Sequence, residues 1–164
     1  YLVFLLPPFH ANISKRLIKS PKLYFHDVGL AAFLLGIESP RQLTTHPLKG
    51  FLFENLIIVE ALKHRFNQGR RSNLAFFRDS TGTEVDLLYG LADQLVAVEV
   101  KAGETVSSSY FRNLKLLRKY MPERVADGIL VHGSESDSTR EGIRVTGPVG
   151  FVPALEKIEQ AIFT

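Results

Sequence analysis

Two carboxylates and a lysine gather at one end of a predicted pair of strands between residues 83 and 101. Asp86 lies in the first strand, and Glu99 and Lys101 lie at the end of the second. Carboxylate oxygens are the ligands that Mg²⁺ prefers, and a lysine ammonium can stabilise negative charge that develops on a phosphate. These residue types in this order indicate a metal-and-phosphate site of the kind that nucleases use.

The side chains of a strand point alternately to its two faces. Alternation places Glu84 and Asp86 on one face of the first strand and Val85 and Leu87 on the other. We interpret Glu84 as a solvated strand residue that shares a face with the site.

A short turn after Tyr89 would set that residue opposite Val96 and would set Asp86 opposite Glu99. Directly opposed residues have Cβ atoms about 4.5–5.5 Å apart, and two like charges there destabilise the pair. A divalent cation neutralises such a pair. Lys101 shares a face with Glu99 and can reach an attacking water or a phosphate.

The elements that must position these residues follow from apolar periodicity and from turn residues. Asp27 is predicted to cap a helix that Gly36 ends. The pattern is typical of an α/β protein with a mixed central sheet and helices on both faces. Strands are expected at residues 1–6, 22–26, 74–78, twice within 83–101, and at 127–132, 143–145 and 150–152; helices at 28–35, 48–67, 107–121 and 153–163; loops at 38–47 and 133–140.

The helix predicted at 48–67 is apolar nearly all round, which is typical of a helix buried in the middle of a domain. Glu54 stands out in its early turns, where the helix dipole favours an anion. Glu54 is therefore either a satisfied acid near a helix start or a third carboxylate of the site.

The composition permits several functions and excludes a few. The chain has 164 residues, 45% of them apolar, and a net charge of +3, so nucleic acid is permitted as a partner but not required. It contains no Cys, which excludes disulfides and Cys-type zinc sites, and its five His residues have no metal-ligand spacing. No apolar run is long enough to span a bilayer, and we expect a cytoplasmic protein without membrane contact.

Asp86 followed by Glu99-Val100-Lys101 resembles the D…(E)xK signature of the PD-(D/E)XK nuclease superfamily. The order helix, three strands, helix, strand is also the core order of that superfamily, so the resemblance implies a restriction-endonuclease-like fold. An acid on the preceding helix often joins the metal site there, and Glu54 matches that position. The proline of the signature is missing, because Val85 precedes Asp86.

A closer resemblance adds the block Pro21–Leu30 and the helix start Gly50–Asn55. Together these blocks resemble the C-terminal domain of unknown function of predicted prokaryotic AAA-type ATPases, over about residues 1–133. In that family an ATPase domain precedes this region, often with a winged-helix segment between them. The resemblance implies that residues 1–20 are the tail of such a segment with a polar linker, and that residues 21–164 are the nuclease-like domain.

The resemblance also implies partners and a cofactor. The partners would be the N-terminal ATPase part of a longer protein and DNA, and the cofactor would be Mg²⁺ or Mn²⁺ held by Glu54, Asp86 and Glu99, with Lys101 as the fourth catalytic residue. The chain has no Gly-x-x-x-x-Gly-Lys-Ser/Thr loop, so it should not hydrolyse ATP by itself.

Four basic residues are candidate phosphate contacts. Arg78 ends the strand beside the site, and Arg112, Lys115 and Lys119 fall at helical spacing on one face of the following helix. A charged helix face is also what solvation alone produces.

Three functions stay open at this point. The first is a divalent-metal-dependent DNA phosphodiesterase. The second is a catalytically inactive nuclease-fold module that binds DNA or protein. The third is an oligomerisation domain that uses its apolar helices. Separately, Asp86 and Glu99 could be structural partners of Lys101 and Arg78.

Overall fold

The structure, a computed structural model, describes residues 1–9 and 20–164. Most of the predicted linker, residues 10–19, lies outside the described residues. The elements are β1 (Val3–Leu6), β2 (Lys22–Phe25), α1 (Val28–Leu34), α2 (Pro40–Thr45), α3 (Lys49–Asn67), β3 (Leu74–Arg78), β4 (Glu84–Leu91), β5 (Gln94–Lys101), the 3₁₀ helix η1 (Ser108–Phe111), α4 (Arg112–Tyr120), β6 (Val125–His132), β7 (Ser138–Arg140), β8 (Ile143–Thr146) and α5 (Pro148–Phe163).

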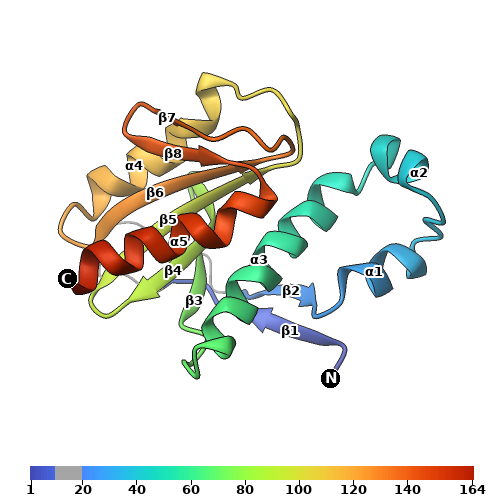
Figure 1. Cartoon of the computed structure of the whole chain (residues 1–164), viewed down its shortest axis with the longest axis horizontal. Helices are drawn as coiled ribbons and strands as arrows, with labels where there is room; N and C mark the ends of the chain where they lie inside the picture. The colour runs from blue at the N-terminus through green and yellow to red at the C-terminus, as the bar shows by residue number, and fades with distance from the viewer. Residues whose placement is uncertain (10–19) are drawn as a thin grey trace.

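A six-stranded mixed sheet forms the centre of the molecule (Figure 1). Its strand order is β3-β4-β5-β6-β8-β7. The neighbours β3, β4 and β5 are antiparallel, β5, β6 and β8 are parallel, and β7 returns antiparallel to β8. The expected mixed sheet is confirmed.

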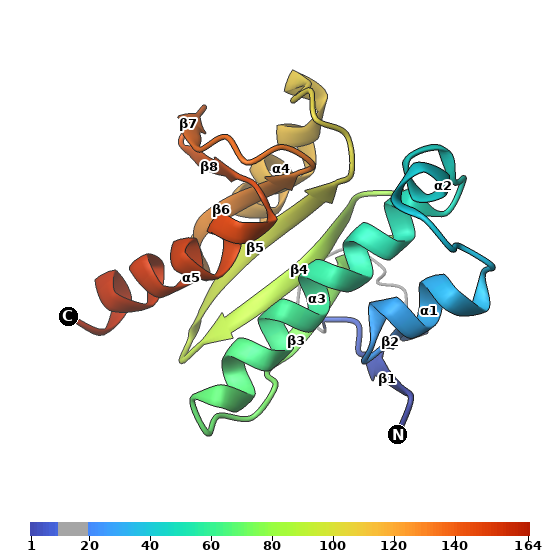
Figure 2. The same ribbon diagram turned by 45° about the vertical axis from the view of Figure 1, so that its right-hand side comes forward.

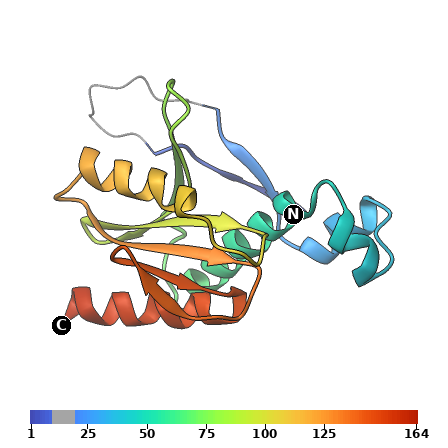
Figure 3. The ribbon, with the colours of Figure 1, turned by 90° about the horizontal axis from the view of Figure 1, so that it is seen from above.

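Helices cover both faces of this sheet, as Figure 3 shows for α4 on one side and α5 on the other. We call the two apolar layers the α3-side core and the α4-side core. The α3-side core lies under α3 and α5, and includes Ile57, Ile58, Leu87, Tyr89, Val98, Phe151 and Leu155. The α4-side core lies under η1 and α4, and includes Phe77, Val85, Leu88, Ala97, Phe111, Leu114 and Leu117. Each fully buried Val, Leu, Ile or Phe side chain among them contributes roughly 1.5–3 kcal/mol.

The central strands are buried along almost their whole length because both of their faces are covered. Every residue of β4 except the first is buried, and every residue of β5 except its two ends is buried. Asp86 and Glu99, which lie inside these strands, are therefore largely removed from water.

A second, two-stranded sheet pairs β1 with β2 and packs on α3. In Figure 2 it lies with α1 and α2 on the side of α3 that is away from α5. Asn55 of α3 holds this sheet: its Oδ1 accepts from the backbone N–H of Phe25 at 2.9 Å, and its Nδ2 donates to the backbone carbonyl of Phe25 at 2.8 Å. The N-terminal strands are thus fixed against the helix that carries Glu54.

Several local predictions are confirmed. Asp27 caps α1, with its side chain accepting from the N–H of Leu30 at 3.0 Å. Gly36 follows the end of that helix with φ of 72°, a conformation that glycine adopts without strain. The long apolar helix is α3.

Three predicted segments are wrong. The loop expected at 38–47 contains α2, which begins with a capping box from Ser39 and Gln42 and with Pro40 in its first turn. The loop expected at 133–140 ends in β7, which pairs along the edge of β8. The strand expected at 150–152 belongs to α5, because Pro148 starts that helix earlier than Pro153 would.

No helix in the described part of the chain is both long enough and apolar enough to cross a membrane.

Candidate functional site

The strands β4 and β5 pair in the predicted register. Tyr89 stands opposite Val96, and Leu87 stands opposite Val98. The paired residues end there, and beyond them Asp86 and Glu99 lie close enough for their charges to interact. The Oδ2 atom of Asp86 accepts a hydrogen bond from the backbone N–H of Val100 at 2.9 Å, which ties the carboxylate to the end of β5.

A change of register between β3 and β4 sets the direction of the acidic side chains. Ala75 of β3 pairs with Leu88. Two residues further along β3, Phe77 pairs with Val85, which is three residues back along β4. The extra residue makes a β-bulge in β4 between Val85 and Leu88, and bulges turn side chains away from strict alternation.

The prediction that Val85 shares a face with Leu87 is therefore wrong. Val85 packs in the α4-side core with Leu88, whereas Leu87 packs in the α3-side core. The bulge is the physical reason, because strict alternation fails where it inserts one residue. Along β5 the alternation is intact, and it places Glu99 with Ala97 on the α4 side.

Asp86, Glu99 and Lys101 form what we call the acidic site. The Nζ atom of Lys101 lies 2.7 Å from Oε1 of Glu99 and 4.0 Å from Oδ2 of Asp86. Glu99 is only 4% exposed. Its second oxygen, Oε2, is buried and has no hydrogen-bond partner among the described residues. A buried carboxylate oxygen without a partner is costly unless a ligand satisfies it.

The two acids of this site resist ionisation. Burial raises the pKa of Glu99 to about 7, the charge of Asp86 adds to this rise, and Lys101 opposes it. Burial likewise raises the pKa of Asp86 to about 6, with a contribution from the charge of Glu54, against the opposing effects of Lys101 and the Val100 N–H. Burial works to lower the pKa of Lys101, but the carboxylates of Asp86 and Glu99 outweigh it and raise that pKa. The lysine therefore stays charged while the acids repel each other.

Glu54 lies on the other side of Asp86 and is held by two residues of β2. Its Oε1 atom accepts from the hydroxyl of Tyr24 at 2.5 Å and lies 3.0 Å from Nζ of Lys22. Burial and the carboxylate of Glu54 raise the pKa of Tyr24 far above its ordinary value.

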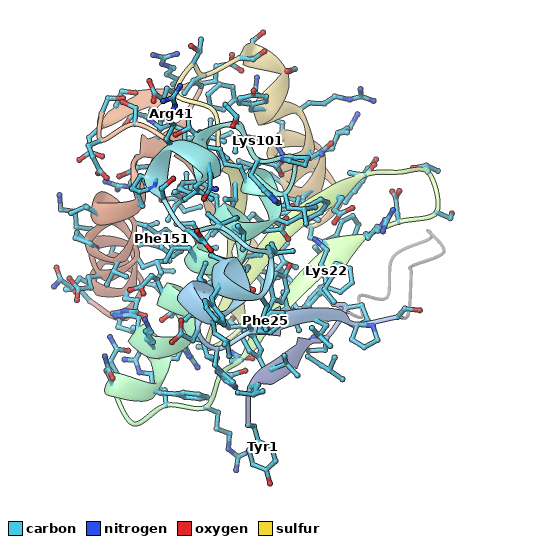
Figure 4. The ribbon with its side chains drawn as sticks, turned by 90° about the vertical axis from the view of Figure 1, so that its right-hand side faces the viewer. Tyr1, Lys22, Phe25, Arg41, Lys101 and Phe151 are labelled. Atoms are coloured by element: carbon cyan, nitrogen blue, oxygen red, sulfur yellow. The ribbon has the colours of Figure 1, made fainter. Side chains whose placement is uncertain are left out.

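Lys22 joins three carboxylates. Its Nζ atom also lies 2.6 Å from Glu84 Oε1 and 3.9 Å from Asp86 Oδ1. We call Lys22, Glu54, Glu84 and Asp86 the Lys22 cluster; Lys22 and Lys101 are labelled in Figure 4. Asp86 belongs to both this cluster and the acidic site. Glu84 is thus a paired residue, contrary to its interpretation as a merely solvated one.

Sequence reasoning missed Lys22 and Tyr24 as members of the site. Their two-residue spacing on a short strand is a signal that they share a face. Nothing local connects them with Glu54, which lies 32 and 30 residues further along the chain.

The three carboxylates predicted to hold a metal ion do not form one group. Within residues 1–9 and 20–164, no three His, Cys, Asp or Glu side chains come together as a set that could hold a metal ion. Asp86 and Glu99 still fit a hard cation, because they are adjacent, they repel each other, and Glu99 Oε2 is unpartnered. Mg²⁺ commonly uses one or two protein carboxylates, with water and substrate completing its shell.

The four predicted phosphate contacts separate into two places. Arg78 lies beside the Lys22 cluster, with its Nε 3.3 Å from Glu84 Oε2. Arg78 pairs with Glu84. If Asp86 and Glu99 were only structural partners of Lys101 and Arg78, then Arg78 would pair with one of those two acids, and among the described residues it does not. Arg112, Lys115 and Lys119 are exposed along α4, and Lys115 is paired with Glu141.

A cavity of about 650 Å³ opens beside the Lys22 cluster, between α1, β2 and α3. Its wall is mainly apolar, and one edge is polar. That edge consists of Lys22, Glu54, Arg78 and Glu84. The Lys22 ammonium therefore borders open space on one side.

Comparison with known proteins places the chain in a family. A family model described as "Domain of unknown function (DUF4143)" matches residues 49–151. The chain belongs to this family. A second model, described as "Domain of unknown function (DUF8612)", matches residues 1–41.

Two mycobacterial relatives share 34% identity with the chain over 109 residues. They are called Uncharacterized protein Mb2031c, of Mycobacterium bovis, and Uncharacterized protein Rv2008c, of Mycobacterium tuberculosis. The matched region covers 63% of this chain but only 23% of each relative. No solved structure matches the chain.

The two family matches divide the site between them. Glu54, Asp86, Glu99 and Lys101 all lie in the DUF4143 part. Lys22 and Tyr24 lie in the part matched by the other model. The acidic site is therefore internal to the DUF4143 part, whereas the Lys22 cluster needs both.

Proposed function

We propose that this DUF4143 chain is a restriction-endonuclease-like nuclease domain that cleaves DNA phosphodiester bonds with Mg²⁺ or Mn²⁺. The observation that carries the proposal is the buried Asp86–Glu99 pair, in which one Glu99 oxygen has no hydrogen-bond partner among the described residues and Lys101 lies beside it. Buried acids whose pKa values are raised by burial and by neighbouring negative charge are concentrated at functional sites.

Asp86 and Glu99 would hold the metal ion. When bound, the ion would lower the pKa of a water molecule and stabilise charge on a phosphoryl oxygen. The Val100 N–H fixes Asp86 in place, so that the carboxylate is oriented before any substrate arrives.

Lys101 would act on the reacting phosphate. Its ammonium lies 2.7 Å from the buried carboxylate of Glu99 and stays charged. From this position it would orient a water molecule and stabilise the negative charge of the transition state. Arg78, at the polar edge of the cavity, would contact the DNA backbone.

We also propose that the chain is the C-terminal part of a larger AAA-type ATPase. The support is the resemblance of its sequence blocks, together with the much greater length of its relatives, of which the matched region is 23%. A cytoplasmic location and the ATPase part as a partner follow from the same proposal.

The test is cleavage of labelled DNA by the 164-residue protein in Mn²⁺ or Mg²⁺. Lys101→Ala and Asp86→Asn should each reduce the cleavage rate by about 100-fold or more, the usual effect of removing a group that acts on the transition state. Lys63→Ala is the matched control, since Lys63 is an exposed lysine paired with Glu60 on α3. Equal cleavage by wild type and Lys101→Ala, or no cleavage of single-stranded, duplex and branched DNA, would contradict the proposal.

One observation favours a second function, a nuclease-fold module without catalysis. The Lys22 ammonium already lies within 4 Å of Glu54, Glu84 and Asp86, so much of the acidic charge is balanced within the protein. This alternative predicts DNA or protein binding that needs no metal ion and that survives Asp86→Ala.

A further inference from the structure

The position of Lys22 has a consequence for how the site binds cations. Its ammonium lies 3.0 Å from Glu54, 2.6 Å from Glu84 and 3.9 Å from Asp86. The Lys22 ammonium therefore neutralises negative charge that three carboxylates concentrate beside the Asp86–Glu99 pair.

The backbone of Lys22 is fixed, but its side chain is not enclosed. The strand β2 is held by its pairing with β1 and by the two hydrogen bonds from Asn55 to Phe25. The Lys22 side chain is 23% exposed and borders the cavity between α1, β2 and α3. A lysine has four rotatable carbons, so the ammonium can leave the carboxylates without any movement of the strand.

The charge balance indicates what would take its place. When all are ionised, the four carboxylates Glu54, Glu84, Asp86 and Glu99 face three cations, Lys22, Lys101 and Arg78. One net negative charge is then left with Lys22 in place, and two are left once it has moved away. The buried Oε2 atom of Glu99 has no hydrogen-bond partner within residues 1–9 and 20–164, which independently indicates that this arrangement can accept a ligand.

We propose that Lys22 is an internal counter-ion of the site, and that a divalent cation binds by displacing it. Displacement removes the Lys22 ion pair from Glu54, while the Tyr24 hydroxyl still donates to its Oε1 atom, so that Oε2 of Glu54 can serve as a further ligand. Lys22 thus lowers the affinity of the site for the metal ion, and Glu54 becomes a ligand only after Lys22 has moved away. This inference rests on the proposed function of the same acidic site. Lys22, which would control the affinity for the metal ion, lies outside the DUF4143 part of the chain.

The first test compares Mn²⁺ binding by isothermal titration calorimetry. Lys22→Met removes the ammonium and keeps an unbranched apolar stem. Because one positive charge beside the ion is removed, Lys22→Met should bind Mn²⁺ about tenfold or more tightly than wild type. The control Lys63→Met removes an exposed ammonium from α3 and should bind as wild type does.

The second test uses the wild-type protein, so its result does not depend on whether the variant folds. A limiting amount of an amine-reactive ester is added with and without Mg²⁺, and the modification of each lysine is measured by mass spectrometry. Displacement by the ion should raise the rate at Lys22 several-fold and leave the rate at Lys63 unchanged. An unchanged or lower rate at Lys22 at saturating Mg²⁺ would overturn the inference.

The outcomes separate this inference from the nuclease proposal. Tighter Mn²⁺ binding by Lys22→Met without DNA cleavage by either protein supports the counter-ion role and contradicts the nuclease. Cleavage by wild type with equal or weaker Mn²⁺ binding by folded Lys22→Met contradicts the counter-ion role alone. If neither protein binds Mn²⁺ at millimolar concentration, both proposals are wrong.

Discussion

Two buried glutamates lie near opposite ends of the β4–β5 hairpin, and their surroundings differ. Glu159 of α5 is 6% exposed and lies by the turn end, where its two oxygens accept from the Tyr89 hydroxyl at 2.6 Å and from Gln68 at 3.2 Å. Glu99 is 4% exposed at the far end, next to another acid and with one oxygen unpartnered. The two residues have similarly small exposed fractions, so the exposed fraction alone does not distinguish a structural acid from a functional one.

The pKa directions express the same difference. Burial works to raise the pKa of Glu159, but hydrogen bonds from Tyr89 and Gln68 and the nearby His64 and Arg70 outweigh it, so the pKa lies below its ordinary value. For Glu99 the burial effect prevails and the pKa rises to about 7. Ionised Glu159 therefore stabilises the fold, whereas ionised Glu99 destabilises it.

The largest expected effect on stability is at Glu159, both of whose carboxylate oxygens accept hydrogen bonds. Glu159→Ala leaves the buried Tyr89 hydroxyl and Gln68 without their acceptor and removes side-chain volume, so the free energy of unfolding should fall by about 3 kcal/mol. Urea denaturation measures the change. Glu156→Ala, on the exposed face of the same helix, is the control and should change stability by less than about 0.5 kcal/mol. Similar losses of stability in the two variants would mean that the hydrogen bonds of Glu159 do not stabilise the fold.

The two ends should also respond oppositely to pH. In the folded protein the pKa values of Asp86 and Glu99 rise to about 6 and about 7, above their ordinary values of 3.8 and 4.5. At pH values between the ordinary and the raised pKa values, the folded state therefore binds more protons than the unfolded state. The free energy of unfolding should then rise, by about 2–3 kcal/mol, as the pH falls from 8 to 5. Below about pH 4.5 it should fall again, because Glu159 has a lowered pKa and loses its charge.

Urea unfolding in steps of one pH unit measures this profile. The Asp86→Asn/Glu99→Gln double variant should lose the rise between pH 8 and 5 and keep the fall at lower pH. A wild-type profile that is flat or that falls from pH 8 to 5 would show that the acidic site is not strained.

A single substitution at Glu99, whose ionised form destabilises the fold, should stabilise the protein. Glu99→Gln mimics the protonated acid, so at pH 8 without metal ions the free energy of unfolding should rise by about 1–2 kcal/mol. Chemical denaturation beside Glu159→Gln, which should lose stability, tests the sign. Destabilisation by both substitutions would mean that Glu99 is an ordinary structural acid.

The smallest effects are expected on the surface of α4. Lys115 pairs with Glu141 in water, and such exposed pairs contribute little, so Lys115→Ala should change stability by less than about 1 kcal/mol. If α4 contacts DNA, then Arg112→Ala and Lys119→Ala should each lower the salt dependence of binding by about one unit of slope. Fluorescence anisotropy at several salt concentrations measures it. Unchanged slopes would mean that these cations are only solvated.

Much of the architecture was predictable from local sequence patterns. Alternating apolar residues in β4 and β5 predicted both strands, and the assumption of a short turn after Tyr89 set Tyr89 opposite Val96, as observed. Asp27 and Gly36 predicted the two ends of α1. The helix α2 was missed although its capping box, Ser39 with Gln42, is readable in the sequence, since two prolines in that stretch indicated a loop.

The site was only partly predictable, because its geometry depends on long-range pairing. The bulge in β4 arises from the pairing of β3 with β4, and no property of Asp86 or Leu87 alone signals it. The contact of Lys22 and Tyr24 with Glu54 joins two segments that do not pair by any local rule. Sequence reasoning therefore named the acids Glu54, Asp86 and Glu99 but not the lysine that lies among them.

The central claim, that the Glu99 end of the hairpin binds a divalent cation, is tested most directly by urea unfolding at pH 8 with and without Mn²⁺. With Mn²⁺ at about one hundred times its dissociation constant, the free energy of unfolding of the wild type should rise by about 2–3 kcal/mol. Glu159→Gln should keep this gain, although it starts from a lower stability, and Glu99→Gln should lose most of it. An equal gain in wild type and Glu99→Gln, or no gain in either, would contradict the claim.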